Sequence, residues 1–222
     1  GMEVDMAFSN KKCDLAINRR KKLGKEVKMM PNYQGLVDRD LDMIQFINKD
    51  NRNIEALVVS GALHANTTDI NEVSGDFPGE LSSALEKEID NSVVIFLQGF
   101  TGNMRPRMII GEEFFRGSYE NTKLFASQLR KQCLDLKAEG EKIDFSGIKL
   151  ASWDESLEID KNIQDGNTVF AKDYPEVYAN WLDLIRDKDL NNWDYRARIS
   201  GIRLTDKLLL VFVNGELVCD YS

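Results

Sequence analysis

The sequence predicts an α/β fold: a single domain built on a mixed β-sheet with helices packed on its faces. Segments with the apolar pattern of strands alternate along the chain with segments that have the pattern of helices, as in α/β proteins. Two pairs of strand segments are joined by short turn sequences, at residues 48–51 and 205–207. Such hairpins pair their strands antiparallel, so the sheet is predicted to be mixed rather than wholly parallel.

The N-terminal part of the chain is predicted to contain mostly strands. Residues 4–8 and 14–17 are short strand candidates, and residues 40–47 alternate polar and apolar side chains, as a half-buried strand does. Residues 55–59 are more continuously apolar, which is typical of a strand covered on both faces. Residues 20–35 mix basic side chains with glycine and proline, and this composition predicts a mobile loop.

Two helices and another strand are predicted in the middle of the chain. Asp76 precedes Pro78, and a capping residue followed by proline in the first turn marks a helix start, with Asp76 as the cap. An apolar strand is expected at residues 93–97. Residues 119–137 form the longest helix candidate, because apolar side chains recur along one face, and Gly140 ends it. The side chains on that face are Phe125, Leu129, Cys133 and Leu136.

The C-terminal third is predicted to add an edge strand, a polar loop, a helix and a hairpin. The edge strand is expected at residues 148–151 and the loop at residues 155–172. Asp173 begins a sequence that is similar to a capping box, so a helix is expected after it. Residues 195–204 and 208–213 are predicted to be the two strands of the hairpin.

Composition argues against several classes of protein. The chain has 222 residues, 42% of them hydrophobic, which is enough for a packed core. Its formal net charge of −8 argues against a nucleic-acid surface, which needs a basic field. No apolar run reaches the ~18 residues of a membrane span, and the N-terminus lacks the apolar core of a signal peptide. We therefore expect a cytoplasmic chain as written, whose three widely spaced cysteines are reduced and buried.

Polar groups follow two apolar strands within residues 57–107, at the ends where α/β folds place ligands. His64, the only histidine, follows the first strand. Its neutral imidazole suits zinc binding or proton transfer, and the alternative is a hydrogen-bonded histidine without a role. The second strand leads into Gly102, Asn103 and Arg105. Amides and guanidiniums there suit a substrate or oxyanion loop, and the alternative is an ordinary surface loop.

Glu216 lies next to a glycine after the apolar strand at residues 208–213, where a carboxylate can reach a cleft or a metal. The alternative is a solvated turn glutamate. The basic run at residues 19–22 is interpreted as a solvated loop. The sequence contains no GxSxG, Walker or GxGxxG motif, and a single histidine excludes a HExxH site. A zinc site built from His64 and carboxylates is compatible with the sequence, but nothing in the spacing requires it.

Six short stretches, taken in order, resemble the neutral/alkaline non-lysosomal ceramidases, in particular the second half of their N-terminal catalytic domain and its shorter bacterial relatives. The stretches are residues 18–20, 35–38 with 41–46, 62–66, 74–79, 102–107 and 215–216. On this basis residues 1–222 are identified as a partial ceramidase-like N-terminal domain.

The resemblance implies a zinc-dependent amidohydrolase that cleaves the N-acyl amide of a sphingolipid. By the same resemblance, His64 and Glu216 are zinc ligands, and Arg19 lines the active site and stabilises the tetrahedral oxyanion. Zinc in such a site polarises the amide carbonyl and lowers the pKa of its bound water. Members of the family are often secreted or periplasmic.

The chain departs from the family pattern in ways that bear on activity. The family's first zinc histidine lies in a His-x-His stretch upstream of any residue matched here, so the chain is expected to begin midway through the domain. The family's tyrosine ligand is not assigned in this chain. In the glycine loop, Asn103 replaces an acid and Arg105 replaces a serine. With at most two zinc ligands, the chain alone is expected to be weakly active or inactive.

The residues leave three interpretations open. The first is a ceramidase-like hydrolase domain for a small-molecule or lipid amide, completed by an upstream segment or a separate chain. It requires His64, Glu216 and Arg19 to converge. The second is a degenerate, non-catalytic relative that serves as a ligand-binding or interaction module, and the third is an unrelated α/β domain. Missing strands would leave an open sheet edge, which predicts a homo-oligomer or pairing with another chain.

Overall fold

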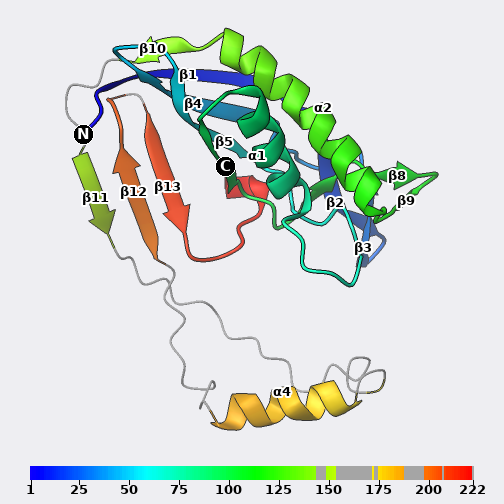
Figure 1. Ribbon diagram of the computed structural model, residues 1–222. Helices are drawn as coiled ribbons and strands as arrows, with labels where there is room; N and C mark the ends of the chain where they lie inside the picture. Colours follow the sequence, from blue (N-terminus) through cyan, green and yellow to red (C-terminus); the bar gives the residue numbers. More distant parts are fainter. Residues whose placement is uncertain (144–148, 154–171, 173–174, 188–197, 207, 222) are drawn as a thin grey trace. The chain divides into compact units, whose positions relative to one another are not determined.

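The computed structural model describes most of the chain (Figure 1). The described residues are 1–143, 149–153, 172, 175–187, 198–206 and 208–221. Two compact units are present. The first consists of residues 1–148, 204–207 and 216–222, and the second of residues 149–203 and 208–215. Every candidate site residue lies in the first unit.

The first unit is organised around a five-stranded mixed sheet with the strand order β10-β1-β4-β5-β6. Its strands are β1 (Val4–Lys12), β4 (Asp40–Asn48), β5 (Ile54–Gly61), β6 (Val93–Gln98) and β10 (Glu141–Ile143). Neighbouring strands are antiparallel except β5 and β6, which run parallel with α1 (Asp76–Glu88) between them in the chain. The predicted α/β class with a mixed sheet is thus confirmed, and each of the strands predicted before residue 100 overlaps an observed one.

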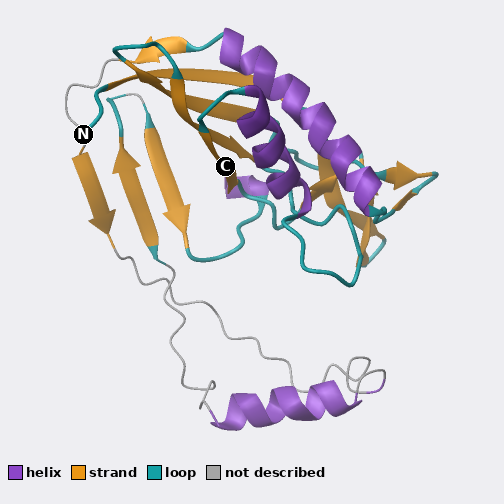
Figure 2. Cartoon of the chain, viewed as in Figure 1, coloured by secondary structure: helices purple, strands orange, loops and turns teal. Residues whose placement is uncertain are grey.

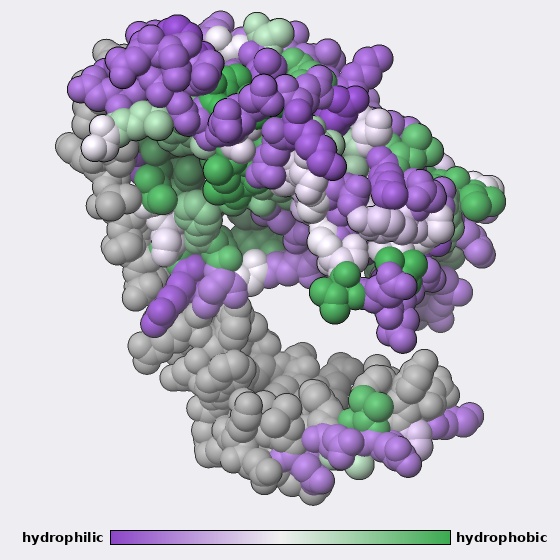
Figure 3. Space-filling model, in the orientation of Figure 1, coloured by the Kyte–Doolittle hydropathy of each residue, from purple (hydrophilic) through white to green (hydrophobic). Residues whose placement is uncertain are grey.

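Helices α1 and α2 (Tyr119–Ala138) lie together on one face of this sheet (Figures 1 and 2). The predicted apolar face of α2 is buried, while the outward surface of the helix is polar (Figure 3). Phe77 of α1 joins the layers, because its ring packs edge-on against Phe96 of β6 and Phe125 of α2, at centroid distances of 5.4 and 5.1 Å. The three cysteines are buried and form no disulfide, as predicted. The resulting core fixes where β5 and β6 end.

The segment predicted to be a mobile loop is a β-hairpin instead. Strand β2 (Ala16–Leu23) pairs with β3 (Glu26–Asn32) on one side and with β7 (Met104–Pro106) on the other, in both cases antiparallel. The turn contains Gly24, whose φ of +62° suits glycine. Side chains at the hairpin end are exposed and largely basic, so the apolar alternation that signals a strand is missing. The basic run at residues 19–22 therefore lies in a strand and not in a loop.

The prediction that Asp76 caps α1 is wrong in its detail. Gly75 occupies the N-cap position, and it has no side chain that could make a cap hydrogen bond. Asp76 has a φ of +49°, and its carboxylate accepts hydrogen bonds from the amide and hydroxyl of Thr67, at 3.0 and 2.6 Å, and from the Phe77 amide at 2.7 Å. Asp76 thus ties the loop that follows His64 to the start of α1.

The second unit contains a three-stranded antiparallel sheet and a helix. The strands are β11 (Lys149–Trp153), β12 (Ile199–Arg203) and β13 (Leu209–Val213), and the helix is α4 (Pro175–Asp187). The predicted edge strand, hairpin and helix are confirmed. The predicted loop at residues 155–172 lies outside the described residues except for Lys172, and so does Asp173. Within the described part of the chain, no helix is both long and apolar enough to cross a bilayer.

Candidate functional site

The C-terminal ends of β5 and β6 lie side by side and position the candidate site. The parallel register places Gly61 opposite Gln98, and the amide of Gly99 donates a hydrogen bond to the Gly61 carbonyl at 2.9 Å. A Cβ at Gly99 would come within 3.1 Å of the Ala62 nitrogen, so glycine permits this close approach. His64 follows β5 three residues after Gly61, and residues 99–103 lead from β6 to Arg105 in β7.

The C-terminal segment of the chain docks on the loop after β6. The Gly102 amide donates to the Leu217 carbonyl at 2.8 Å. A Cβ at Gly102 would lie 3.0 Å from that carbonyl oxygen, so only glycine lets the two backbones come this close. Beside this contact, the hydroxyl of the buried Thr101 lies 3.4 Å from Glu216 Oε1. The docking therefore places Glu216 at the ends of β5 and β6.

Asn103 makes a second contact with the same segment. Its side-chain carbonyl accepts a hydrogen bond from the Cys219 amide at 2.9 Å, and its side-chain amide donates to Asp220 at 2.8 Å. Both residues belong to the 3₁₀ turn η2 (Cys219–Tyr221). Asn103 is 4% exposed, so these bonds are shielded from water. In this structure the two polar ends of Asn103 are used to hold the C-terminus.

His64, Glu216 and Arg19 meet at this position. His64 Nε2 lies 3.1 Å from Glu216 Oε1, and Arg19 Nη2 lies 3.7 Å from the same oxygen. Arg19 Nη2 also donates to the Gly102 carbonyl at 3.0 Å, which fixes the direction of the guanidinium. The side chains of His64 and Arg19 are 25% and 16% exposed, and that of Glu216 is 48% exposed. Three residues far apart in the sequence thus form one cluster, and their chemical roles stay predictions.

The three residues predicted to form a substrate or oxyanion loop have different surroundings. The Gly102 carbonyl accepts hydrogen bonds from Arg19 and Arg20, and its amide is engaged by Leu217. Asn103 is engaged as described above. Arg105, in β7, is buried, and its guanidinium lies over the ring of Phe114 in β9 (Glu113–Phe114), 4.9 Å from the centroid. Their role toward a substrate also stays a prediction.

The surroundings of His64 favour the neutral imidazole. Burial lowers the pKa of His64 below its ordinary value of 6.5, and the positive charge of Arg19 lowers it further, while the carboxylate of Glu216 raises it. Arg105 and Arg116 also lower it. Nδ1 of the ring is buried and has no hydrogen-bond partner among the described residues. At pH 7 the ring is therefore a neutral base with an unused nitrogen.

The pair formed by His64 and Glu216 fits one part of a zinc site. An imidazole nitrogen and a carboxylate oxygen are suitable zinc ligands, and two tetrahedral ligands at about 2.1 Å from zinc are about 3.4 Å apart. The observed separation of 3.1 Å is close to that value. A zinc site needs at least three protein ligands, and the described residues contain no group of three acidic, cysteine or histidine side chains that could hold a metal. These residues therefore do not complete a zinc site.

Two residues near Glu216, Gln98 and Thr101, were not predicted as site residues. Gln98, the last residue of β6, donates a hydrogen bond to the Thr101 hydroxyl at 2.9 Å, and that hydroxyl faces Glu216. Neither residue belongs to a recognisable motif. The only signal was their position directly after an apolar strand.

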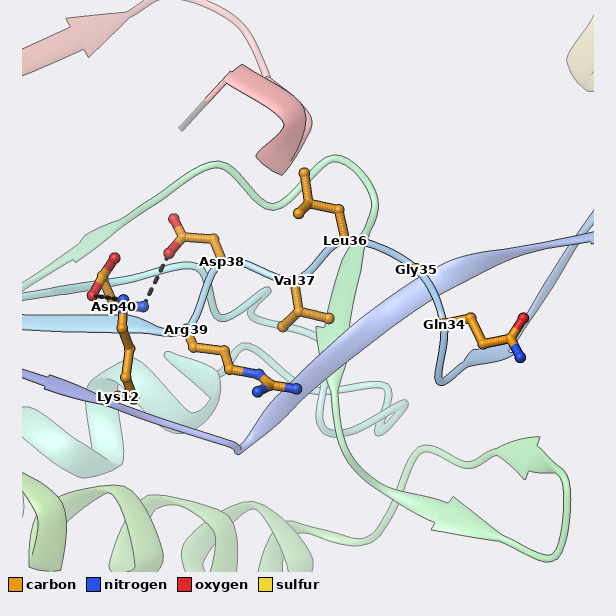
Figure 4. A pocket seen from close by; sticks show the side chains of 8 residues that line it. All are labelled: Lys12, Gln34, Gly35, Leu36, Val37, Asp38, Arg39 and Asp40. Atoms are coloured by element: carbon orange, nitrogen blue, oxygen red, sulfur yellow. Dashed lines mark hydrogen bonds and ion pairs between the residues drawn. The ribbon is translucent and has the colours of Figure 1, made fainter.

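A separate cavity of about 640 Å³ opens along the segment between β3 and β4 (Figure 4). It is lined by Lys12 and residues 34–40, and Lys12 forms an ion pair with Asp40 there at 2.5 Å. None of the candidate site residues lines it. The cluster around His64 and this cavity are therefore different features of the first unit.

Comparisons with known proteins agree with this topology at the level of the fold. No protein-family model matches the sequence, and no curated protein matches it. Solved structures do match. A ceramidase complexed with C2 superposes with a TM-score of 0.58 at 14% identity, and the neutral ceramidase from Pseudomonas aeruginosa superposes with a TM-score of 0.55 at 15% identity. The chain has a ceramidase-like fold.

The ceramidase-like region includes most of this chain but little of the matched proteins. The two matches cover 70% and 71% of this chain, and 25% and 26% of the ceramidases. The chain thus spans about a quarter of their length. At this level of identity the likeness establishes the fold and leaves the activity to be tested.

The first prediction concerns the docked C-terminal segment. Gly102→Ala is expected to loosen residues 217–221, because the new Cβ collides with the Leu217 carbonyl. Hydrogen–deuterium exchange should then be at least about tenfold faster at those amides, which corresponds to roughly 1.4 kcal/mol of lost local stability. Gly79→Ala is the control, since a Cβ there meets nothing within 4 Å. Equal protection in both variants would contradict the contact.

The second prediction concerns the pKa of His64, which NMR can follow without ambiguity because it is the only histidine. Glu216→Gln removes a carboxylate that favours the imidazolium, so the pKa of His64 should fall further. Arg19→Gln removes a cation that disfavours the imidazolium, so the pKa of His64 should rise. Glu120→Gln, an exposed change on α2, should leave it unchanged.

The same shift links His64 to stability. The folded chain binds this proton more weakly than the unfolded chain does, so the neutral ring favours folding above the ordinary pKa of 6.5. That contribution is lost as the pH falls below 6.5 toward the folded-state pKa. Glu216→Gln should make the loss on acidification steeper.

Proposed function

We propose that the chain is a ceramidase-like amidohydrolase domain that acts on an N-acyl amide of the sphingolipid type and is weakly active by itself. The observation that carries this proposal is the convergence of His64, Glu216 and Arg19 at the C-terminal ends of two parallel strands. Ligands bind at that end of the sheet in α/β folds. The matched structures that share this fold are ceramidases, and this likeness suggests amide hydrolysis as the reaction.

In this proposal His64 and Glu216 are the zinc ligands of the domain, joined by ligands that the described residues do not supply. Zinc, when bound, would act on the amide carbonyl as a Lewis acid. The low pKa of His64 suits a ligand, because only the neutral ring has a lone pair for a metal. Thr101 faces the Glu216 oxygen that also lies closest to His64 and so fixes its orientation.

Arg19 is proposed to stabilise the negative charge that develops on the amide oxygen. Its guanidinium is largely buried and is held by the Gly102 carbonyl, so it needs no reorganisation when that charge appears. Glu216 lies within 3.7 Å and partly offsets the charge of Arg19 in the resting site. A fixed cation beside a partly buried imidazole suits the negative charge that develops on the carbonyl oxygen during acyl transfer.

The remaining parts of the site are proposed to come from an upstream segment or from a separate chain. The chain spans about a quarter of the length of the matched ceramidases, so those proteins contain further residues that could complete such a site. Strand β6 has a neighbour on one side only among the described strands, and Val93 and Ile95 on it are 56% and 48% exposed. This open edge is where we expect another chain or a second copy to pair.

The third prediction is enzymatic. The purified chain should release fatty acid slowly from an N-acylsphingosine when zinc is present, and a chelator should abolish the release. His64→Ala and Glu216→Gln should lower the rate by about 10- to 100-fold, because each removes a metal ligand. Glu120→Gln should retain the full rate. No release at any zinc concentration would reject activity of the chain by itself and would favour the non-catalytic binding module.

The fourth prediction concerns association through β6. Light scattering at micromolar concentration should give a mass above that of one chain, 25.3 kDa. Ile95→Lys places a charge on the exposed edge and should return the protein to a monomer, whereas Leu124→Lys, at an equally exposed site on α2, should not. A monomer before any substitution would count against an open edge that pairs.

A further inference from the structure

Arg105 is a buried cation whose setting is unusual for a structural residue. It is 7% exposed, and in β7 it lies opposite Ile17 of β2. Ile17 precedes Arg19 by two residues in that strand. Its contacts are the face of Phe114 and a long contact of 3.8 Å from Nη1 to the sulfur of Met29. Neither contact neutralises its charge, and buried guanidiniums are normally paired with an anion.

One edge of the Arg105 guanidinium is open. Among the described residues, no hydrogen bond is made by its Nε or Nη2, and no carboxylate lies within 4 Å of it. Within the described part of the chain, the fully buried side-chain atoms without a partner are Ser9 Oγ, His64 Nδ1 and Asn66 Oδ1. Nε and Nη2 of Arg105 are not among them, so each keeps some exposure to water. Nε and Nη2 form the side edge of the guanidinium, a pair of parallel donors that binds both oxygens of a carboxylate.

The open edge belongs to a local positive region next to the cluster around His64. Burial lowers the pKa of Arg105, and the charges of Arg116 and Arg19 lower it further. Both Arg105 and Arg116 also act on His64, so these charges lie close to the candidate site. Glu216 offsets Arg19, but Arg105 and Arg116 have no acidic partner within 4 Å among the described residues. This region is positive in a chain whose net charge is −8.

We propose that Arg105 binds a carboxylate on the amine side of the substrate, so that the domain prefers an N-acyl amino acid to a neutral N-acyl amide. The amide part of this inference rests on the proposed function, and the charge is the new element. Arg105 pairs with Ile17, which lies two residues from Arg19 on β2, so a carboxylate attached close to the amide nitrogen would face the open edge while the amide lies beside His64 and Arg19. Arg105 is in this sense a specificity-determining residue.

Binding of three ligands with the same acyl chain tests the inference. Isothermal titration calorimetry would compare N-octanoylglycine, the neutral N-octanoylethanolamine and octanoate, at low and high salt. We expect N-octanoylglycine to bind at least about tenfold more tightly than the neutral amide, since a charged hydrogen-bonded pair is involved. The preference should weaken with salt. Equal affinity for the two amides would overturn the inference. Octanoate binding as tightly as N-octanoylglycine would assign Arg105 to the fatty-acid product instead.

Two substitutions at Arg105 and one control locate the effect. Arg105→Met should remove the preference for the glycine conjugate. Arg105→Lys keeps the charge but loses the paired donors, and it should reduce the preference severalfold. Arg107→Met removes the same charge from an exposed site two residues away and should keep the preference. A preference that survives Arg105→Met in a folded variant, or is lost equally in Arg107→Met, would refute the assignment.

Binding and hydrolysis separate this inference from the proposed function. Tight, Arg105-dependent binding of the glycine conjugate without hydrolysis of any amide would reject the enzymatic proposal and leave the ligand assignment standing. Hydrolysis of neutral amides without a preference for the glycine conjugate would reject the ligand assignment and leave the enzymatic proposal standing.

Discussion

The candidate site depends on the docking of the C-terminal segment against the loop after β6. The Gly102 amide and the two ends of the Asn103 side chain hold residues 217–220 in place, and Glu216 is carried to the strand ends by this contact. Without it, the carboxylate would have no fixed relation to His64. A short backbone-to-backbone contact between segments more than a hundred residues apart therefore determines whether the cluster exists.

The charges near His64 are mostly positive, whereas the chain as a whole is acidic. The protein is acidic overall, with a net charge of −8, yet arginines surround the partly buried imidazole. Burial and these cations keep His64 neutral, while one carboxylate partly offsets them. A neutral base beside fixed guanidiniums suits an anionic ligand or a developing negative charge, and the same electrostatics connect the proposed hydrolysis with the proposed preference for a carboxylate.

Several of the stretches that resemble ceramidases contact one another in the structure. Asn18 donates to the Leu36 carbonyl at 2.9 Å, and a Cβ at Gly35 would lie 2.6 Å from Asn18. Leu36 also accepts a contact from the sulfur of Cys219 at 3.3 Å. Gly35 leaves room for the side chains of Asn18 and Asn32, and Asn18 binds a backbone carbonyl of the neighbouring segment.

The sequence by itself determined the elements whose signals are local. The buried face of α2, the hairpin of β12 and β13, and the start of α1 near Pro78 follow from apolar periodicity, turn residues and a helix-start signal within a few positions of each other. The β2–β3 hairpin escaped prediction because its exposed, basic side chains carry no such period. Only the tertiary structure decided that Glu216 faces His64, that Thr101 orients it, and that Arg105 is buried with an open edge. These are contacts between distant segments, and a chain's local pattern does not encode which backbones will meet after it has folded.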